Sequence, residues 1–315
     1  MLDTIYKAIN FLCNEQLETG EFHSEKYFNR ELAGEGVFDS SPFTTAIVLY
    51  GLSFCSHTLL NSIQEKAYRY LEAEQEGPGL WRYWSSDNEN TIAPDLDDIC
   101  CISFLVENAP VRFRRELFNK ELLIRNRHNP SGLFFTWIKP EGEDNDVDGI
   151  VNANVLMYLG ENEDTVPARD ILIEAILEDR EPLAYWYYLD DLSLYYAISR
   201  ARFHGVTGFD KCRQAIIEKT EKKVTDAHID LSELQLALAA CIFLNFEKHG
   251  HPFLHHAINQ LVALQQEDGG WAKCAYYTGP EPPYPHTVFW GSKVMTTGVC
   301  IEAIARFQKV SDGNW

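Results

Sequence analysis

The stretch Pro94-Asp95-Leu96-Asp97-Asp98-Ile99-Cys100 places three carboxylates within four residues, directly before an apolar run at 99–106 that predicts a helix. Acidic residues often cap a helix start and interact favourably with the helix dipole. Three of them beside an apolar run are more than a cap requires. Crowded carboxylates cannot all ionise at low cost, so at least one is expected to have a raised pKa and could donate a proton.

The pattern around this stretch recurs along the chain. Residues 60–75 are amphipathic, a loop rich in Gly and aromatic residues follows, and the acids then open the apolar helix. Five further units repeat this order. Asp190-Asp191 is expected to start the fourth apolar helix and Asp230 the fifth. The other helix pairs are expected at 4–17 and 46–54, 113–125 and 151–159, 167–177 and 192–201, 209–222 and 231–244, and 252–266 and 294–307.

Six such pairs predict an all-α protein whose apolar helices form an inner ring and whose amphipathic helices form an outer ring, an (α/α)6 barrel. No sustained alternation of polar and apolar residues indicates a sheet. No linker divides the chain, so we expect residues 1–315 to form a single domain. An α-solenoid of stacked repeats is the alternative. The recurrent loop aromatics favour the closed barrel, because they need a shared interior.

Composition narrows the classes of partner. The formal net charge of -20 disfavours nucleic acid and anionic membranes, because phosphate groups would be repelled. Neither a signal peptide nor a membrane span is expected. The eight cysteines form no CxxC pair and lie mostly in apolar helical runs, which predicts reduced, buried thiols in a cytoplasmic protein. The sequence leaves the oligomeric state open.

Aromatic residues recur in the loops that precede the apolar helices. Their π faces stabilise cations and exclude water, so they could line a reactive cavity. For any single ring, packing in the barrel core is the alternative, and only the recurrence favours a lined cavity. The residues expected to bind a substrate are Trp81, Trp84, Trp137, Trp186, Tyr188, Trp271, Tyr277 and Trp290.

An acidic loop at 141–148 is the third group of functional candidates. Its alternating carboxylates suit Mg²⁺ or Ca²⁺, with Asp144, Asp146 and Asp148 as the expected ligands. A solvated acidic loop is an equally good interpretation, because the spacing of an EF-hand is missing. The ten histidines show no paired ligand spacing, which disfavours zinc. No GxSxG, P-loop or GxGxxG motif occurs, which removes the commonest hydrolase and nucleotide-binding classes.

Two motifs resemble a known family. Asp95-Leu96-Asp97-Asp98 resembles the DxDD motif of class II terpene cyclases, such as squalene–hopene and copalyl diphosphate cyclases. Gln265-Gln266-Glu267-Asp268-Gly269-Gly270-Trp271 looks like the QW repeat of the same superfamily, with looser matches at 75–81 and 129–135. The resemblance covers nearly the whole chain, which has room for only one of the helical domains found in larger members. The chain is therefore most similar to the monodomain meroterpenoid cyclases, which act on prenylated aromatic acids.

The resemblance implies a role for each acid. Asp97 would protonate the terminal alkene or epoxide of a polyprenyl chain as general acid, while Asp95 and Asp98 hold and polarise it. The aromatic lining would then guide the carbocation through successive ring closures. Class I chemistry is disfavoured, because Asp190-Asp191 lacks the following acid of a DDxxD motif.

The implied substrate is a small-molecule isoprenoid. It is a linear polyprenyl chain on an aromatic acid or, alternatively, farnesyl or geranylgeranyl diphosphate that keeps its diphosphate. Mg²⁺ held by the acidic loop, with Lys139 or Arg82 assisting, could anchor an anionic head group. No other cofactor is expected.

Two other classes remain open. An (α/α)6 carbohydrate-active enzyme could use Asp97 with Asp190 or Asp191 as a carboxylate pair, and sugar sites also use aromatic platforms. A long polar groove would favour that class, whereas a closed apolar pocket would favour the cyclase. In a non-catalytic binding protein, Asp97 would be exposed with no cavity beside it.

Overall fold

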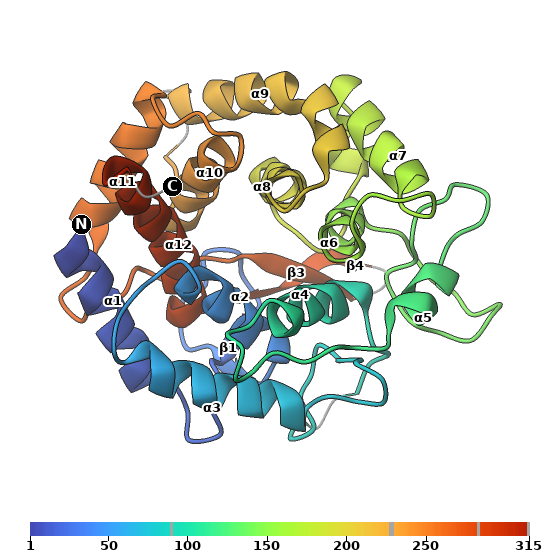
Figure 1. The fold of residues 1–315 in the computed structure, drawn as a ribbon, viewed down its shortest axis with the longest axis horizontal. Helices are drawn as coiled ribbons and strands as arrows, with labels where there is room; N and C mark the ends of the chain where they lie inside the picture. The colour runs from blue at the N-terminus through green and yellow to red at the C-terminus, as the bar shows by residue number, and fades with distance from the viewer. Residues whose placement is uncertain (89–90, 227–229, 282–283, 314–315) are drawn as a thin grey trace.

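Two concentric rings of helices make up the structure, a computed structural model that describes residues 1–88, 91–226, 230–281 and 284–313 (Figure 1). The inner ring consists of α2 (Pro42–Leu52), α4 (Leu96–Glu107), α6 (Gly149–Leu159), α8 (Asp191–Phe203), α10 (Glu233–Asn245) and α12 (Lys293–Ser311). The outer ring consists of α1 (Leu2–Glu15), α3 (Leu60–Ala73), α5 (Lys120–Arg125), α7 (Val166–Leu177), α9 (Arg213–Thr225) and α11 (Pro252–Leu264). Short 3-10 helices lie at Glu181–Leu183 and Thr207–Lys211.

The inner ring is closed. Each inner helix packs on the next in chain order, and α12 packs on α2. The inner helices are buried on almost all sides, as expected for helices without a polar face. The predicted (α/α)6 barrel is therefore confirmed, and the open solenoid is wrong. In the part of the chain that the structure describes, no helix combines the length and apolarity needed to cross a membrane.

The starts of α5 and α10 differ from the prediction for identifiable reasons. The helix expected at 113–125 begins only at Lys120, because the backbone N–H groups of Phe113 and Arg114 bond to Pro110 in a turn. The start of α10 is set by Ser232, whose side chain forms a reciprocal capping box with Gln235. Asp230 therefore does not cap this helix.

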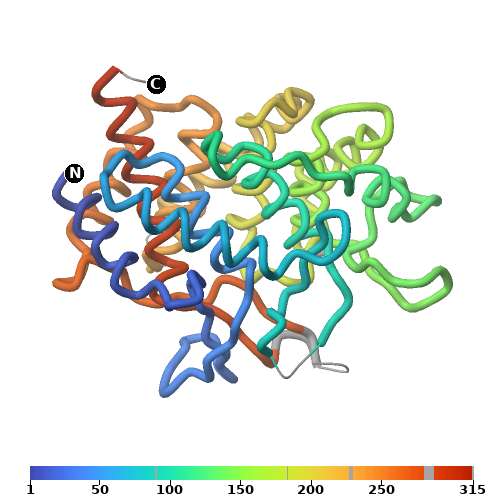
Figure 2. The backbone as a smooth tube through the Cα atoms, turned by 60° about the horizontal axis from the view of Figure 1, so that its bottom comes forward, coloured from blue at the N-terminus to red at the C-terminus, as the bar shows by residue number. Residues whose placement is uncertain are grey.

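A small sheet at one end of the barrel corrects the expectation of no strands. It is antiparallel in the order β2-β1-β4-β3, with β1 at Ser24–Tyr27, β2 at Val37–Asp39, β3 at Tyr277–Glu281 and β4 at Tyr284–Gly291. Figure 2 shows these strands at the end where α12 begins. Strands of three and four residues, and two longer ones in a Pro/Tyr-rich loop, are too short or irregular to give a period-two pattern. The sheet joins the first and last units, because β1 pairs with β4.

Two tryptophan side chains connect their loops to the preceding outer helices by hydrogen bonds. The indole N–H of Trp271 donates to the carbonyl of Leu261 in α11 at 2.7 Å. Trp81 donates in the same way to Leu71 in α3 at 2.8 Å. Both rings are fully buried, so the QW-like stretch and its looser match at 75–81 are structural.

The glutamine of the QW-like stretch joins consecutive outer helices. Gln265 Nε2 donates to the carbonyls of Gly269 and of Thr4 in α1, both at 2.8 Å. Gly269 has φ +95°, and a Cβ there would lie 2.4 Å from the carbonyl oxygen of Lys7. Only glycine fits this approach without strain or displacement of α1.

We therefore expect Gly269→Ala to lower the free energy of unfolding by about 2–4 kcal/mol, from left-handed backbone strain and the forced shift of α1. Urea unfolding measures the effect. Gly250→Ala is the matched control, because Gly250 has open space around its Cβ position. Equal effects of the two substitutions would contradict the account of this loop.

Candidate active site

The acidic motif forms the buried first turn of α4. Asp95 is the cap, since its Oδ1 accepts the backbone N–H of Asp98 at 2.9 Å, so the helix begins at Leu96, three residues before the apolar run at 99–106 that predicts it. Asp97 and Asp98 follow in the first turn, and all three side chains are at most 9% exposed. The segment before the helix is held by Thr136, whose carbonyl accepts the N–H of Leu96 at 2.8 Å.

Asp97 has a hydrogen-bond donor on each carboxylate oxygen. The hydroxyl of Tyr188 donates to Oδ2 and the amide of Asn154 donates to Oδ1, both at 2.5 Å. Burial raises the pKa of Asp97, while these two bonds and the nearby charge of Arg200 act in the opposite direction. Asp97 can therefore hold a proton in a dry site and still leave a stabilised carboxylate after losing it.

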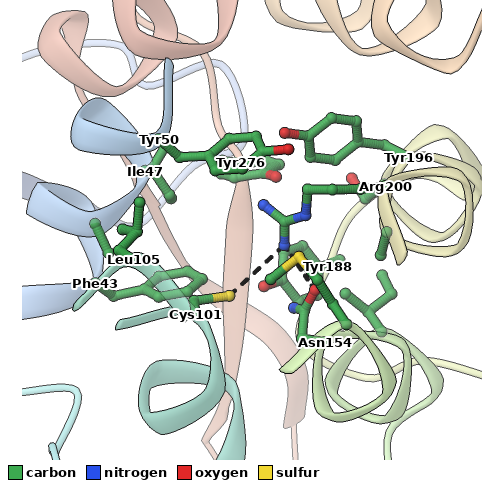
Figure 3. A pocket seen from close by; sticks show the side chains of 15 residues that line it. Phe43, Ile47, Tyr50, Cys101, Leu105, Asn154, Tyr188, Tyr196, Arg200 and Tyr276 are labelled. Carbon is green, nitrogen blue, oxygen red and sulfur yellow. Dashed lines mark hydrogen bonds between the residues drawn. The ribbon is translucent and has the colours of Figure 1, made fainter. Parts of the chain in front are cut away.

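Arg200 completes this arrangement from α8. Its Nη2 donates to the amide oxygen of Asn154 at 2.6 Å, which fixes the amide so that its nitrogen faces Asp97. The guanidinium lies over the rings of Tyr50 and Tyr196, at 5.1 and 5.0 Å from their centres (Figure 3). The group borders a small interior cavity of about 20 Å³. The sequence prediction missed Arg200, because Arg202 follows it in the same helix and nothing in the segment distinguishes the buried arginine from the more exposed one.

Asp95 and Asp98 form a crowded pair beside Asp97. Within the described ranges, the Oδ2 atoms of both are buried without a hydrogen-bond partner. Burial raises the pKa of Asp95 to about 7 and holds that of Asp98 well above its usual range, and the nearby charge of Asp97 adds to both. The motif therefore retains protons at neutral pH, as its crowding predicts.

The raised pKa of Asp95 makes stability depend on pH. Because the folded protein holds this proton more tightly than the unfolded chain, the stabilisation is complete below about pH 4 and is lost as pH rises to about 7. Asp95→Asn keeps the capping oxygen but removes the titration, so the fall in unfolding free energy between pH 4 and 8 should shrink by on the order of 3 kcal/mol. Denaturant titrations at several pH values measure this. Identical pH dependence in the two proteins would contradict a protonated Asp95.

A cavity of about 480 Å³ opens beside the acids. Five of the aromatic residues predicted to bind substrate line it: Trp84, Trp137, Tyr188, Tyr277 and Trp290. Phe43, Tyr83 and Tyr187 extend the aromatic wall, and Lys139 and Asp146 add polar groups. The cavity is a pocket bounded largely by rings, with the carboxylates of α4 in its wall.

Three predicted aromatic residues lie elsewhere. Trp81 and Trp271 are buried in the core, where they hold the outer helices together. Trp186 is 53% exposed, and its backbone N–H donates to Asp148 at 2.6 Å. The expectation that these three rings line the site is corrected, because loop recurrence does not determine which way a ring points.

The three predicted metal ligands are not brought together. Asp144 is exposed, and Asp148 is a buried cap whose Oδ1 accepts two backbone N–H groups at the start of α6. Burial raises the pKa of Asp148 to about 6. Asp146 accepts the indole N–H of Trp137 at 3.1 Å and the hydroxyl of Tyr187 at 2.7 Å. In the described ranges no group of three His, Cys, Asp or Glu side chains could hold a metal, so the residues do not fit the magnesium site.

The carboxylate pair of the carbohydrate alternative is also separated. Asp190 caps α8 and forms an ion pair with Lys223 at 2.7 Å, in a different cavity of about 460 Å³. Asp191 accepts the hydroxyl of Tyr185 at 2.7 Å. Neither residue lines the cavity that contains Asp97.

Comparisons with known proteins address the fold. No family model matches the chain, and no curated protein matches it. Among solved structures, the chain is similar to the type II terpene cyclase MstE from Scytonema, with a TM-score of 0.73, 14% identity and 98% of each chain covered. A variant of MstE was solved in complex with its substrate, geranylgeranyl dihydroxybenzoate.

Two further solved structures share the arrangement. A protein from Actinoplanes aligns with a TM-score of 0.74 and 17% identity, over 98% of this chain and 99% of its own. The GH76 alpha-mannanase from Bacteroides thetaiotaomicron aligns with a TM-score of 0.64 and 9% identity, over 99% of this chain and 97% of its own. At these identities the likeness establishes the fold: the chain is an (α/α)6 barrel of the kind found in a type II terpene cyclase and in a mannanase.

Proposed function

We propose that this protein catalyses the protonation-initiated cyclisation of a linear polyprenyl chain, with Asp97 as general acid. The observation that carries the proposal is the position of Asp97, buried in the wall of an aromatic cavity with a donor on each oxygen. A carboxylic acid in a dry site is a strong proton donor when fixed groups stabilise its conjugate base. Tyr188, and Asn154 backed by Arg200, supply that stabilisation here.

The reaction begins with transfer of the Asp97 proton to the terminal alkene, which forms a C–H bond and a tertiary carbocation. The next double bond of the chain attacks this cation, closing a ring and moving the positive charge along the chain. Asp95 caps α4 and so holds Asp97 in place, and Asp95 and Asp98, as protonated acids, avoid two further charges beside it. Loss of a carbon-bound proton ends the sequence, so substrate and product are isomers.

The aromatic wall supplies the second requirement of this chemistry. Ring faces stabilise cations, an effect that is worth about 2 kcal/mol or more when water is excluded. Tyr277 and Trp290 stack at 5.9 Å between ring centres, and Tyr83 meets both edge to face. Such packed rings present a continuous surface to the cation, and a substrate that fills the cavity between them would exclude the water that quenches it.

The proposed substrate is a prenylated aromatic acid, the class to which the MstE substrate geranylgeranyl dihydroxybenzoate belongs. Among the described residues that line the cavity, Lys139 is the sole cation and suits a carboxylate head. Arg82 lies outside this lining and pairs with Glu76. A prenyl diphosphate that keeps its diphosphate is the alternative substrate.

No step of the proposed reaction passes through a metal. Mg²⁺ enters only as a counter-ion for a diphosphate head, so each substrate is assayed with Mg²⁺ and with EDTA. We further propose that the chain acts as a single domain in the cytoplasm. The eight cysteines support a reducing compartment, since all are free thiols.

A substrate panel tests the function. The purified protein is incubated with farnesyl and geranylgeranyl dihydroxybenzoate, with the two corresponding prenyl diphosphates, and with mannan and maltooligosaccharides. We expect cyclic isomers from a prenylated benzoate and no cleavage of either glycan. Glycan hydrolysis without cyclisation of any prenyl substrate would overturn the proposal in favour of a carbohydrate-active enzyme.

A further inference from the structure

Two carboxylates outside the acidic motif, those of Asp39 and Asp146, accept hydrogen bonds from the polar edges of the aromatic rings that line the cavity. Each of the three indoles that line the cavity donates its N–H to one of them. Trp290 and Trp84 donate to Asp39 Oδ2 at 2.6 and 3.2 Å. Trp137 donates to Asp146 Oδ2 at 3.1 Å. The two carboxylates therefore hold the full set of indoles in the described lining.

Tyrosine hydroxyls also lie within hydrogen-bonding distance of both carboxylates. Tyr187 donates to Asp146 Oδ2 at 2.7 Å, and Tyr83 lies 3.4 Å from Asp39 Oδ2. The other oxygen of Asp39 accepts the amide of Asn88 at 3.0 Å. The donors named here are all neutral, so neither carboxylate charge is cancelled by an ion pair among the described contacts.

Distant segments meet at Asp39. It lies on β2 and pairs in register with Ser24 of β1, while Trp290 of β4 pairs with Lys26 of the same strand. Trp84 comes from the loop between α3 and α4. A buried carboxylate at this junction, only 4% exposed, is costly to desolvate even with neutral hydrogen-bond donors around it, whereas an uncharged acceptor could fix the same rings at lower cost.

Negative charge beside these rings matters for a cation. A carboxylate that accepts an indole N–H increases the electron density of the ring and so strengthens its attraction for a cation on its face. The charge itself also attracts a cation across the low-dielectric cavity, where electrostatic interactions are weakly screened. A neutral prenyl chain gains nothing from either effect.

We propose that Asp39 and Asp146 are positioning residues that fix the three indoles in the cavity wall and make the cavity select a carbocation over a neutral chain. The inference rests on the proposed cyclase function for its biological meaning. Asp146, expected from the sequence to bind a metal, is thereby assigned to the aromatic wall. Asp39 had no sequence signal, because the sheet that positions it was not predicted.

Binding of a stable cation tests the proposal without turnover. The probes are N,N-dimethylfarnesylamine, which is protonated at neutral pH, and the neutral hydrocarbon in which carbon replaces its nitrogen. Asp39→Asn and Asp146→Asn keep the side-chain shape and an acceptor oxygen but remove the charge. We expect each to weaken binding of the ammonium probe about tenfold, measured by tryptophan fluorescence, with binding of the hydrocarbon changed less than about twofold.

Glu21→Gln is the matched control, because Glu21 is an equally buried carboxylate outside the cavity lining. It should leave the ratio of the two affinities unchanged. Thermal unfolding of all variants shows which are folded, and Asp146→Asn tests the proposal if Asp39→Asn does not fold. Equal loss of both probes, or loss of neither, would overturn the charge-based role.

The ring number of the reaction products distinguishes failure of this inference from failure of the proposed function. If the protein cyclises prenyl chains, both variants should release a larger share of products with fewer rings, because the later cations are less stabilised. An unchanged product ratio in folded variants would overturn the inference while leaving the cyclase function intact. Absence of cyclisation by the unmodified protein would overturn the function, and selective ammonium binding would still support the role of Asp39 and Asp146.

Discussion

Asp97→Asn should reduce cyclisation by at least about 10³-fold while leaving the fold intact, because the amide cannot donate a proton to an alkene. An alkene is a very weak base, so no other step can compensate for a missing acid. Asn at this position can still bond to Tyr188 and Asn154, which keeps the surrounding contacts. Product formation from the prenylated benzoate, measured by chromatography, gives the rate.

The control is Asp3→Asn, which changes an exposed acid in the first turn of α1 and should leave the rate unchanged. Asp97→Glu keeps the acid but moves it, so a partial loss is expected. If folded Asp97→Asn retained more than about a tenth of the activity, the proton would come from another group, and Asp98 would become the general acid to test.

Arg200→Gln should lower the rate by about 10- to 100-fold, since it removes one charge-assisted interaction from the chain that stabilises the Asp97 carboxylate. Glutamine can still donate to Asn154, so the effect isolates the charge. The arginine charge lowers the pKa of Asp97, and its loss makes Asp97 a weaker acid with a higher pKa. Kinetics with the prenylated benzoate measure the rate.

The pH profile distinguishes this role from simple destabilisation. Activity requires protonated Asp97 and falls as pH rises through its pKa, so the alkaline limb of Arg200→Gln should move to higher pH as the maximal rate drops. Arg200→Lys keeps a charge and should lie between the two proteins. A lower rate with an unmoved alkaline limb would show that Arg200 acts only through packing.

The sequence predicts the barrel because the barrel depends on local pattern. Apolar and amphipathic helices alternate, and the QW-like loop at 265–271 carries its own glycine and tryptophan signals. The acidic motif is also local: one helix start supplies Asp95, Asp97 and Asp98. Both features can therefore be predicted without knowing which helices are in contact.

The rest of the site depends on contacts between distant segments. Asn154 reaches Asp97 from α6, and Arg200 reaches Asn154 from α8, and nothing in their own segments indicates these contacts. Asp39 reaches Trp290 only because β1 pairs with both β2 and β4. The direction of a loop ring is also set by tertiary packing, which is why Trp186 and Trp271 were misassigned.

Isotope incorporation tests the central claim, initiation by a solvent-exchangeable proton, most directly. The reaction is run in D₂O with the prenylated benzoate, and the product is examined by mass spectrometry and NMR. The Asp97 proton exchanges with solvent between turnovers, so we expect one non-exchangeable deuterium per product, on the carbon that was the protonated end of the terminal alkene. A cyclic product without deuterium would contradict protonation by Asp97 and the mechanism proposed for this protein.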